Sequence, residues 1–351
     1  MNIRYKAPIG LGIWLLVLLT ILAGCESGSY NPPKETLNGT QKGNIDTSAA
    51  STVPVTDSRP IVLGFSQLGS ESDWRKANTL SIQEAAKESG VELILDNAEQ
   101  SQEQQFAAIR RFIKLGVDVI AIAPVIQSGW ESILKEVQEA GIPVLILDRA
   151  VGIRDSSQYV SLIGSDFYEE GRKAGKYLLD KMSNSPGPIG IVELKGTEGS
   201  TPSIDRGKGF HDTIKERKDL TVLVSESADF TYEKGRDVMR SILKEKGRKI
   251  RVLFSHNDDM ALGAIEAIEE YGLRPGKDIV IISVDGTRKA MEKMAEGKIN
   301  CVVECNPLLG PNLMQAVKEL MAGRSIPKRI VTPESVFTEV TAGREVGNRK
   351  Y

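Results

Sequence analysis

Residues 61–95 read IVLGFSQLGSESDWRKANTLSIQEAAKESGVELIL, and this stretch decides the fold class. Residues 61–66 form an apolar run that is typical of a buried strand, and residues 91–95 form a second one. Between them, residues 74–89 have the spacing of an amphipathic helix, which Gly90 is expected to end. A buried strand, a helix and another buried strand predict a parallel βαβ unit, with helices covering the sheet.

The same alternation continues to residue 321 and is interrupted once, after residue 147. The further strands are expected at residues 117–123, 144–147, 189–194, 221–225, 252–254, 279–284 and 299–303, and the further helices at residues 101–115, 130–140, 168–181, 204–216, 232–244, 260–271 and 312–321. Two consecutive sets of this length predict an α/β fold of two doubly wound parallel-sheet lobes rather than one large sheet.

The N-terminus is typical of an export signal. Residues 1–24 have a basic flank, an apolar run of about 15 residues and small residues at a cut site, whereas a membrane-spanning helix needs about 20. The sequence Leu22-Ala23-Gly24-Cys25 resembles the lipobox of bacterial lipoproteins, which implies that Cys25 is lipidated. An ordinary signal peptide and a short anchor helix are the alternatives. Residues 25–60 are mostly Ser, Thr, Asn, Gly and Pro, which predicts a disordered tether; a processed pro-segment is the alternative.

Composition argues against nucleic-acid binding and catalysis. The chain has 45 Lys and Arg against 47 Asp and Glu, interspersed, and a net charge of -2, so a basic footprint is missing. His211 and His256 lie in different strand–helix units without metal-ligand spacing. No strand is followed by a glycine-rich dinucleotide loop or a phosphate loop. We therefore expect a protein that is not an enzyme and that uses no cofactor and no metal.

The two cysteines of the predicted folded part are expected to be unpaired. On one extended strand Cys301 and Cys305 would lie about 13 Å apart at ~3.3 Å per residue. A disulfide needs Cα atoms within about 7 Å. The fold therefore depends on its hydrophobic core.

Polar side chains gather where the predicted strands end or the next helix begins, which is the edge at which open parallel sheets bind ligands. Carboxylates, amides and guanidinium groups together satisfy vicinal sugar hydroxyls, and an aromatic plane packs on the sugar ring. The candidate ligand-binding residues are Ser66, Gln67, Ser70, Trp74, Arg75, Asp148, Arg149, Arg206, Phe230, Asn257, Asp285 and Glu304.

Some of these residues also have a purely structural interpretation. Asp148 could cap a turn, Asp285 lies in a common Asp-Gly turn dipeptide, and Trp74 could be a core residue. Asp258 and Asp259 precede the helix expected at residue 260, and we expect them to cap it. It is the coincidence of many polar residues at sheet ends that favours ligand binding.

At these positions the chain resembles the type I periplasmic binding proteins of the ribose/galactose class, the solute receptors of ABC sugar importers. The resemblance covers residues 61 to about 338. The segments that carry it are Gly64-Phe65-Ser66-Gln67 with Trp74-Arg75, Ile142-Pro143-Val144 with Leu147-Asp148-Arg149, Asp205-Arg206-Gly207 with Phe210, His256-Asn257-Asp258-Asp259-Met260 and Val284-Asp285-Gly286. Residues 64–75, residues 123–131 and Val303-Glu304 are more similar to galactofuranose-binding members than to ribose receptors.

The resemblance implies a division of the chain and of the site. It implies that three strands cross between the lobes, so that residues 61–164 with 305–332 form the N-terminal lobe and residues 165–304 with 333–351 the C-terminal lobe. It also implies that ring hydroxyls are bound by Asp148 and Arg149 from the first lobe and by Arg206, Asn257, Asp285 and Glu304 from the second, with Trp74 or Phe230 stacking on the ring.

The functional hypothesis is an extracytoplasmic receptor, anchored in the cell membrane through lipidated Cys25, that closes on a monosaccharide and delivers it to an ABC permease. The expected ligand is galactofuranose-like or a related hexose or pentose, and the protein is expected to be a monomer that binds no nucleic acid. One alternative is a ligand sensor for a sensor kinase or chemoreceptor. Another is a receptor for a cyclitol or a quorum signal.

Overall fold

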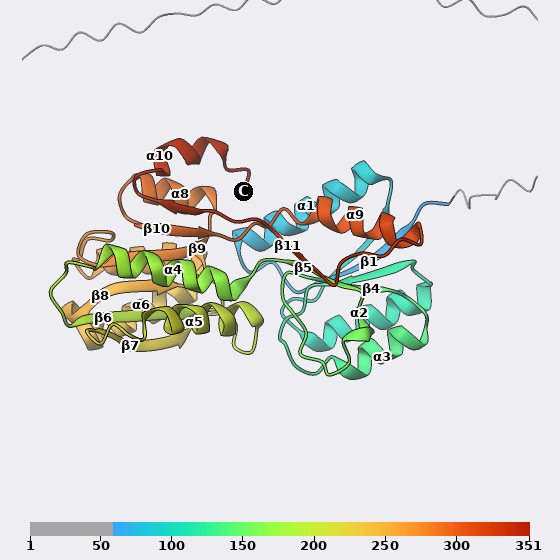
Figure 1. Cartoon of the computed structure of the whole chain (residues 1–351), viewed down its shortest axis with the longest axis horizontal. Coiled ribbons are helices and arrows are strands. Elements are labelled where there is room, and N and C mark those ends of the chain that lie inside the picture. Colours follow the sequence, from blue (N-terminus) through green and yellow to red (C-terminus); the bar gives the residue numbers. More distant parts are fainter. Residues whose placement is uncertain (1–58) are drawn as a thin grey trace, which may run out of the picture. The chain divides into compact units, whose positions relative to one another are not determined.

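The computed structural model describes residues 59–351, so the signal segment, Cys25 and all but the end of the tether lie outside the described residues. The described residues form two six-stranded sheets (Figure 1). The first sheet has the order β11-β5-β4-β3-β1-β2 and parallel pairing throughout. Its strands are β1 (Val62–Gln67), β2 (Glu92–Asn97), β3 (Val119–Ile122), β4 (Val144–Leu147), β5 (Ser161–Gly164) and β11 (Arg329–Val331).

The second sheet repeats this arrangement in the order β12-β10-β9-β8-β6-β7. Its edge strand β12 pairs antiparallel with β10, and the other pairs are parallel. Its strands are β6 (Ile189–Lys195), β7 (Leu220–Ser227), β8 (Ile250–Ser255), β9 (Val280–Asp285), β10 (Cys301–Glu304) and β12 (Val336–Thr338). Each sheet with its helices is called a lobe below, and the two lobes confirm the predicted fold class.

Helices cover both faces of each sheet. In the first lobe, one face is covered by α1 (Asp73–Ser89) and α9 (Gly310–Met321), and the other by α2 (Gln102–Leu115) and α3 (Glu131–Glu139). In the second lobe, one face is covered by α4 (Phe167–Lys181) and α5 (Thr201–Ile214). The other face is covered by α6 (Tyr232–Lys246), α7 (Asp258–Glu270), α8 (Arg288–Ala295) and α10 (Ala342–Glu345). Short 3-10 helices span residues 156–158, 247–249 and 346–348. No helix within residues 59–351 is both long and apolar enough to cross a membrane.

The apolar strands explain this layering. Along β3, Val119 and Ala121 pack into the cluster beneath α1 and α9, whereas Ile120 and Ile122 pack into the cluster beneath α2 and α3. Alternate side chains of a strand point to opposite faces, so a strand covered on both faces must be apolar at every position. This is why continuous Val, Ile and Leu runs predicted the fold.

Some short elements were not predicted from the pattern. They are β5, β11, β12, α8 and α10. Each strand among them has only three or four residues, and β11 and β12 gain their hydrogen bonds from strands far away in the sequence. Helix α8 buries only Ala290, Met291 and Met294, so its apolar periodicity is weak. Such elements depend on tertiary pairing more than on local pattern.

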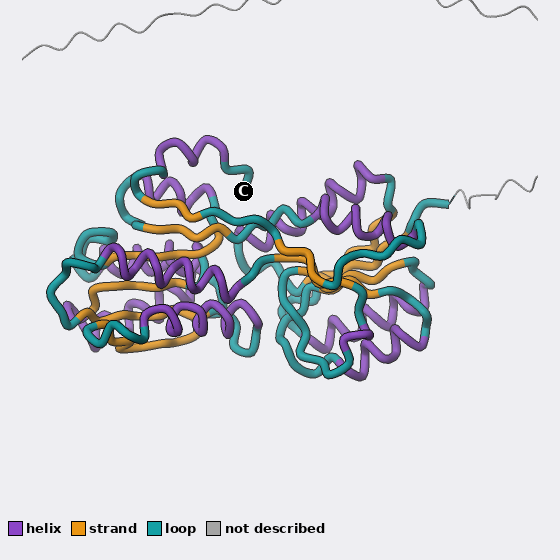
Figure 2. The backbone as a smooth tube through the Cα atoms, in the orientation of Figure 1, coloured by secondary structure: helices purple, strands orange, loops and turns teal. Residues whose placement is uncertain are grey.

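The chain passes from one sheet to the other three times, after β5, after β10 and between β11 and β12 (Figure 2). We call these three segments the crossovers. Backbone hydrogen bonds connect them: Thr332 N–H donates to Gly164 O at 3.1 Å, and Glu304 N–H donates to Ser335 O at 2.9 Å. The lobes are thus joined by neighbouring strands rather than by one linker.

Candidate ligand-binding site

A small cavity lies between the lobes. It lies at the carboxyl ends of strands from both sheets, as expected for doubly wound folds. Its lining residues are Glu71, Ser72, Trp74, Arg75, Asp148 and Arg149 from the first lobe, Pro202, Arg206, Phe230, Asn257 and Asp285 from the second, and Cys305 from a crossover.

In the first lobe, Asp148 and Arg75 form a buried ion pair. Asp148 follows β4, and its carboxylate Oδ2 accepts a hydrogen bond from Arg75 Nη2 at 2.5 Å. Arg75 also donates to Glu71 Oε1 at 3.3 Å and to Gln67 Oε1 at 3.4 Å. Asp148 has a left-handed backbone with φ of 60°. Such a conformation costs energy for a residue with a side chain and gathers at functional sites.

Arg149 points from the same segment toward the second lobe. Its Nη1 donates to Val125 O at 2.7 Å, and its guanidinium lies 5.2 Å from the ring centroid of Phe230. Among residues 59–351, none accepts a hydrogen bond from Arg149 Nε. Burial, and next the charge of Arg75, lowers the pKa of Arg149 to about 10. The buried Nε–H of Arg149 therefore lacks a hydrogen-bond partner, which a ligand hydroxyl could supply.

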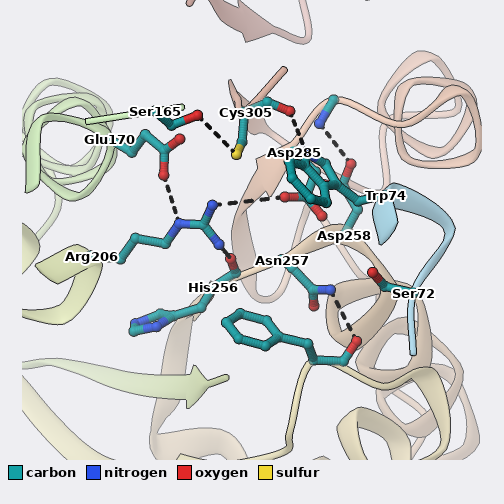
Figure 3. Close-up of polar contacts among 12 residues, drawn as sticks. Ser72, Trp74, Ser165, Glu170, Arg206, His256, Asn257, Asp258, Asp285 and Cys305 are labelled. Atoms are coloured by element: carbon teal, nitrogen blue, oxygen red, sulfur yellow. Dashed lines mark hydrogen bonds and ion pairs between the residues drawn. The ribbon is translucent and has the colours of Figure 1, made fainter. Parts of the chain in front are cut away.

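In the second lobe, Arg206 on α5 connects three groups (Figure 3). Its Nε donates to Glu170 Oε2 at 2.7 Å, its Nη1 donates to His256 O, and its Nη2 lies 3.9 Å from Asp285 Oδ1. Burial alone would lower the pKa of Arg206, but the charge of Glu170, its hydrogen bond and the other neighbouring groups together raise it. The guanidinium is therefore held in one orientation beside the cavity.

Asp285, the last residue of β9, is held by its neighbour Asp258. The Asp258 carboxylate accepts hydrogen bonds from Gly286 N at 2.8 Å, Thr287 N at 2.7 Å and Ser283 Oγ at 2.5 Å. This fixes the turn in which Asp285 has a φ of 127°. Within the described residues the Asp285 carboxylate accepts no hydrogen bond, and burial, followed by the charge of Asp258, raises its pKa well above the usual value. Its oxygens are thus available to hydroxyl donors.

The lining holds equal numbers of acidic and basic side chains. Three carboxylates (Glu71, Asp148 and Asp285) face three guanidinium groups (Arg75, Arg149 and Arg206). Each of these side chains is at least nine-tenths buried. A charged ligand would leave one buried charge without compensation, which is costly. A neutral molecule with many hydroxyl groups satisfies donors and acceptors without disturbing the balance.

Two aromatic residues complete the lining. Trp74, at the start of α1, donates from Nε1 to Cys305 O at 2.7 Å and packs into a hydrophobic cluster of the second lobe. Phe230 packs on Gly196, where a Cβ atom would lie 1.8 Å from Phe230 Cζ. Both rings are buried and reach the cavity. Either can offer an apolar plane to the C–H face of a sugar ring.

Gly196→Ala is expected to weaken ligand binding at least tenfold. The added methyl group must displace the Phe230 ring, and the cavity is the open side. In a Phe230→Ala background the same substitution should have little further effect, because the two positions act through one contact. Calorimetric titration of the four proteins measures this coupling. Equal losses in both backgrounds would show that Gly196 does not act through Phe230.

The structure brings most of the predicted site residues together at the cavity. Those in the lining are Trp74, Arg75, Asp148, Arg149, Arg206, Phe230, Asn257 and Asp285. Four predicted residues lie elsewhere. Ser66 is buried within β1, where Gln105 Nε2 donates to its hydroxyl at 3.4 Å. Ser70 is exposed in the following loop.

The other two predicted residues outside the lining, Gln67 and Glu304, form hydrogen bonds within the protein. Gln67 Nε2 donates to Asn78 Oδ1 at 3.0 Å, while its oxygen faces Arg75. Glu304 accepts from Arg349 Nη2 at 2.8 Å, near the end of the chain. Both follow or end a strand, as predicted, but nearby donors and acceptors occupy their polar atoms.

The start of α7 corrects one prediction. Asn257, rather than Asp258 or Asp259, caps this helix: its Oδ1 accepts from Met260 N at 3.0 Å, and its Nδ2 donates to Phe230 O at 3.0 Å. Asp258 instead holds the turn that carries Asp285. Sequence reasoning also missed Glu71, Ser72, Pro202 and Cys305 in the lining. Glu71 and Ser72 directly precede the start of α1, and this position next to a helix N-terminus is the sequence signal that could have identified them.

The two histidines, which the sequence places in separate units, meet at one carboxylate. His211 Nε2 lies 3.0 Å from Glu193 Oε2, and His256 Nε2 lies 3.0 Å from Glu193 Oε1. Burial alone would raise the pKa of Glu193, but hydrogen bonds from both imidazoles lower it. This cluster holds the imidazole of His256, and the main-chain oxygen of His256 accepts a hydrogen bond from Arg206 Nη1. Cys301 and Cys305 are both buried and free, as predicted.

Two doubly wound lobes, three crossovers and a polar cavity between the lobes define a periplasmic binding protein of type I. The model of the periplasmic binding protein domain family matches residues 63–325, and the chain belongs to this family. Proteins of this family are extracytoplasmic binding proteins.

Particular relatives narrow the comparison. The chain is 39% identical to the galactofuranose-binding protein YtfQ of Escherichia coli (strain K12), over 83% of this chain and 92% of that protein. A Mycobacterium smegmatis protein in complex with β-D-fucofuranose is 47% identical, with a TM-score of 0.81, over 83% of this chain and 95% of that one. The binding protein of the arabinose ABC transporter from Shewanella sp. ANA-3, bound to α- and β-L-arabinofuranose, is 44% identical, with a TM-score of 0.79, over 82% and 95%.

Proposed function

We propose that this protein is a sugar receptor of an ABC importer, which closes its lobes on one neutral monosaccharide in the furanose form and delivers it to the permease. The observation that carries the proposal is the charge-balanced cavity, with three carboxylates and three guanidinium groups from two lobes. We infer that the cavity binds its ligand without transforming it, because its charged side chains pair with one another.

The same groups explain why closure needs a ligand. In the closed cavity, Asp285 and the Nε of Arg149 lose water and gain no replacement hydrogen bond from the described residues. Burying such groups without partners costs free energy. Sugar hydroxyls supply the missing partners only when both lobes surround them. A ligand shifts a conformational equilibrium through this kind of differential contact.

The furanose form is supported by relatives at 39–47% identity. Those relatives are described as binding galactofuranose, β-D-fucofuranose and L-arabinofuranose. These sugars differ in their substituents and share the five-membered ring. We infer that this chain selects the ring form with the fixed groups Asp148, Arg149 and Arg206, and that Phe230 or Trp74 stacks on the ring.

We further propose that Cys25 carries the lipid anchor and that residues 26–60 hold the lobes away from the membrane. Leu22-Ala23-Gly24-Cys25 supports this proposal. Mass spectrometry of the membrane fraction should find a diacylglyceryl group on Cys25, and Cys25→Ser should release the protein. An unmodified Cys25 in a membrane-bound wild type would contradict the anchor.

A sugar panel tests the ligand class. D-Galactose, D-fucose, L-arabinose, D-fructose, D-ribose and myo-inositol should be titrated while thermal unfolding is followed. A ligand at 100 times its Kd adds about 2.7 kcal/mol to the free energy of unfolding. We expect the first three to shift the melting temperature and D-ribose and myo-inositol to have little effect. A shift with myo-inositol alone would show that the ligand is a cyclitol rather than a sugar. The proposal would be refuted if none of the compounds shifted the melting temperature.

A further inference from the structure

The three crossovers meet at one largely buried cluster, which shares only Cys305 with the lining of the sugar site. Ser165 comes from the first crossover, Cys305 from the second and Glu334 from the third, and Glu170 reaches them from α4. Ser165 Oγ lies 3.2 Å from Cys305 Sγ and donates to Glu334 Oε1. Polar atoms of Glu170, Cys305 and Glu334 all lie within 4.8 Å of one another.

Two carboxyl groups in this cluster face each other. Glu170 is fully buried, and its Oε1 has no hydrogen-bond partner among the described residues. A carboxyl oxygen of Glu334 lies within 4.8 Å of a carboxyl oxygen of Glu170. A bond between two carboxyl groups needs a proton on one of them. Burial, and next the charge of Glu170, raises the pKa of Glu334 to about 9, which places the proton on Glu334.

Besides Cys305, which lines the cavity, the cluster is connected to the sugar site through Glu170. The second oxygen of Glu170, Oε2, accepts from Arg206 Nε at 2.7 Å. The remaining nitrogens of Arg206 contact His256 O and approach Asp285, which lines the cavity (Figure 3). The position of Glu170 therefore decides where the guanidinium of Arg206 lies.

We propose that Glu334 and Glu170 share one proton in the closed conformer, and that this pair positions Arg206 for the sugar. The inference rests on the proposed function. With the proton, the pair carries one negative charge, and Glu170 keeps its hydrogen bond with Arg206. Without it, two buried negative charges repel each other and draw Glu170 away from the guanidinium group. Because the three crossovers supply this cluster, the proton also holds them in their closed arrangement.

The other groups around Glu334 are compatible with this assignment. Lys173 Nζ donates to the Glu334 main-chain oxygen at 3.1 Å, so it does not neutralise the carboxyl group directly. Burial raises the pKa of Cys305 well above the usual value, and the thiol stays neutral. Several titratable or charged groups face Glu334: Glu170 and Lys173 on α4, Arg206 on α5, Cys305 on the second crossover and Arg329 on β11. The hydroxyl groups of Ser165 and Thr332 lie beside them.

The sign of the pH effect follows from the raised pKa. A group whose pKa is raised in the closed conformer stabilises that conformer at low pH, and the stabilisation is lost as the pH rises through about 9. Burial, and next the charge of Asp73, raises the pKa of Asp259 to about 7, so Asp259 changes its charge at lower pH. Arg149, with a pKa of about 10, acts at higher pH. The informative range is therefore pH 7.5–9.5.

The test compares wild type, Glu334→Gln and the control Glu339→Gln, a glutamate on the same C-terminal stretch that pairs with Lys181. D-Galactose and L-arabinose affinities are measured by calorimetry from about pH 7.5 to 9.5. Wild type and control should lose about tenfold in affinity across this range. Glu334→Gln, which keeps an N–H donor and has no proton to lose, should bind like wild type at pH 7.5 and show a flat profile.

Equal pH profiles for wild type and Glu334→Gln would overturn the inference, as would a profile that EDTA abolishes, since the cluster would then hold a metal ion. Absence of sugar binding by wild type at pH 7.5 would refute the proposed function instead. Thermal unfolding of the ligand-free proteins decides in that case. Between pH 7.5 and 9.5 the melting temperature of wild type should fall relative to that of Glu334→Gln. Parallel plots of melting temperature against pH would reject the shared proton.

Discussion

Asp285→Asn is expected to weaken sugar binding about 100-fold without lowering the stability of the ligand-free protein. The Asp285 carboxylate accepts no hydrogen bond from the described residues and faces the cavity. Hydrogen bonds to a charged group contribute about 1.5–3 kcal/mol each, so two ring hydroxyls account for about 3 kcal/mol. Burial raises the pKa of Asp285, which means that the fold disfavours the charge that the ligand needs.

Calorimetry gives the affinity and a melting curve gives the stability. The matched control is Asp278→Asn, because Asp278 pairs with Arg274 on the surface away from the cavity. The control should change sugar affinity less than twofold. A variant Asp285→Asn that binds as tightly as wild type would remove Asp285 from the site. A large drop in its melting temperature would show that the residue is structural.

Asp148→Asn is expected to reduce both affinity and stability. Asp148 forms the 2.5 Å hydrogen bond with Arg75, and the amide leaves the Arg75 cation buried without this partner. Breaking a buried ion pair from one side costs about 3 kcal/mol, and sugar affinity should fall about 100-fold. Asn tolerates the left-handed φ of 60°, so the backbone is retained.

Asp148→Ala separates the effect of backbone strain from the effect of losing the charge. Ala at this φ adds about 1 kcal/mol of strain, so it should melt below Asp148→Asn while both bind sugar equally poorly. Denaturant unfolding and calorimetry measure the two quantities. Wild-type affinity in either variant would contradict the assignment of Asp148 to the sugar site.

These two carboxylates show what the sequence could reveal. Asp148 and Asp285 each follow or end an apolar strand, and the rule that ligands bind at the carboxyl ends of parallel strands found both. Glu304 ends a strand in the same way, yet Arg349 occupies its carboxylate. The position of a polar residue is local information, whereas its partners depend on residues far away in the chain.

The fold shows the same limit. Continuous apolar strands and amphipathic helices predicted the two lobes, because burial on both faces demands apolar residues at every strand position. Strands β11 and β12 have three residues each and form only by pairing with β5 and β10. Glu170 sits within an ordinary amphipathic helix. Its role becomes visible only when α4 meets the crossovers.

The most direct test of the charge-balanced cavity is a calorimetric comparison at pH 7 of D-galactose with D-galacturonate and D-galactosamine. The three compounds have nearly the same shape and differ in net charge. We predict that the neutral sugar binds and that both charged analogues bind at least 100-fold more weakly, because either charge is left uncompensated among three carboxylates and three guanidinium groups. Binding of either charged analogue as tightly as D-galactose would contradict the account.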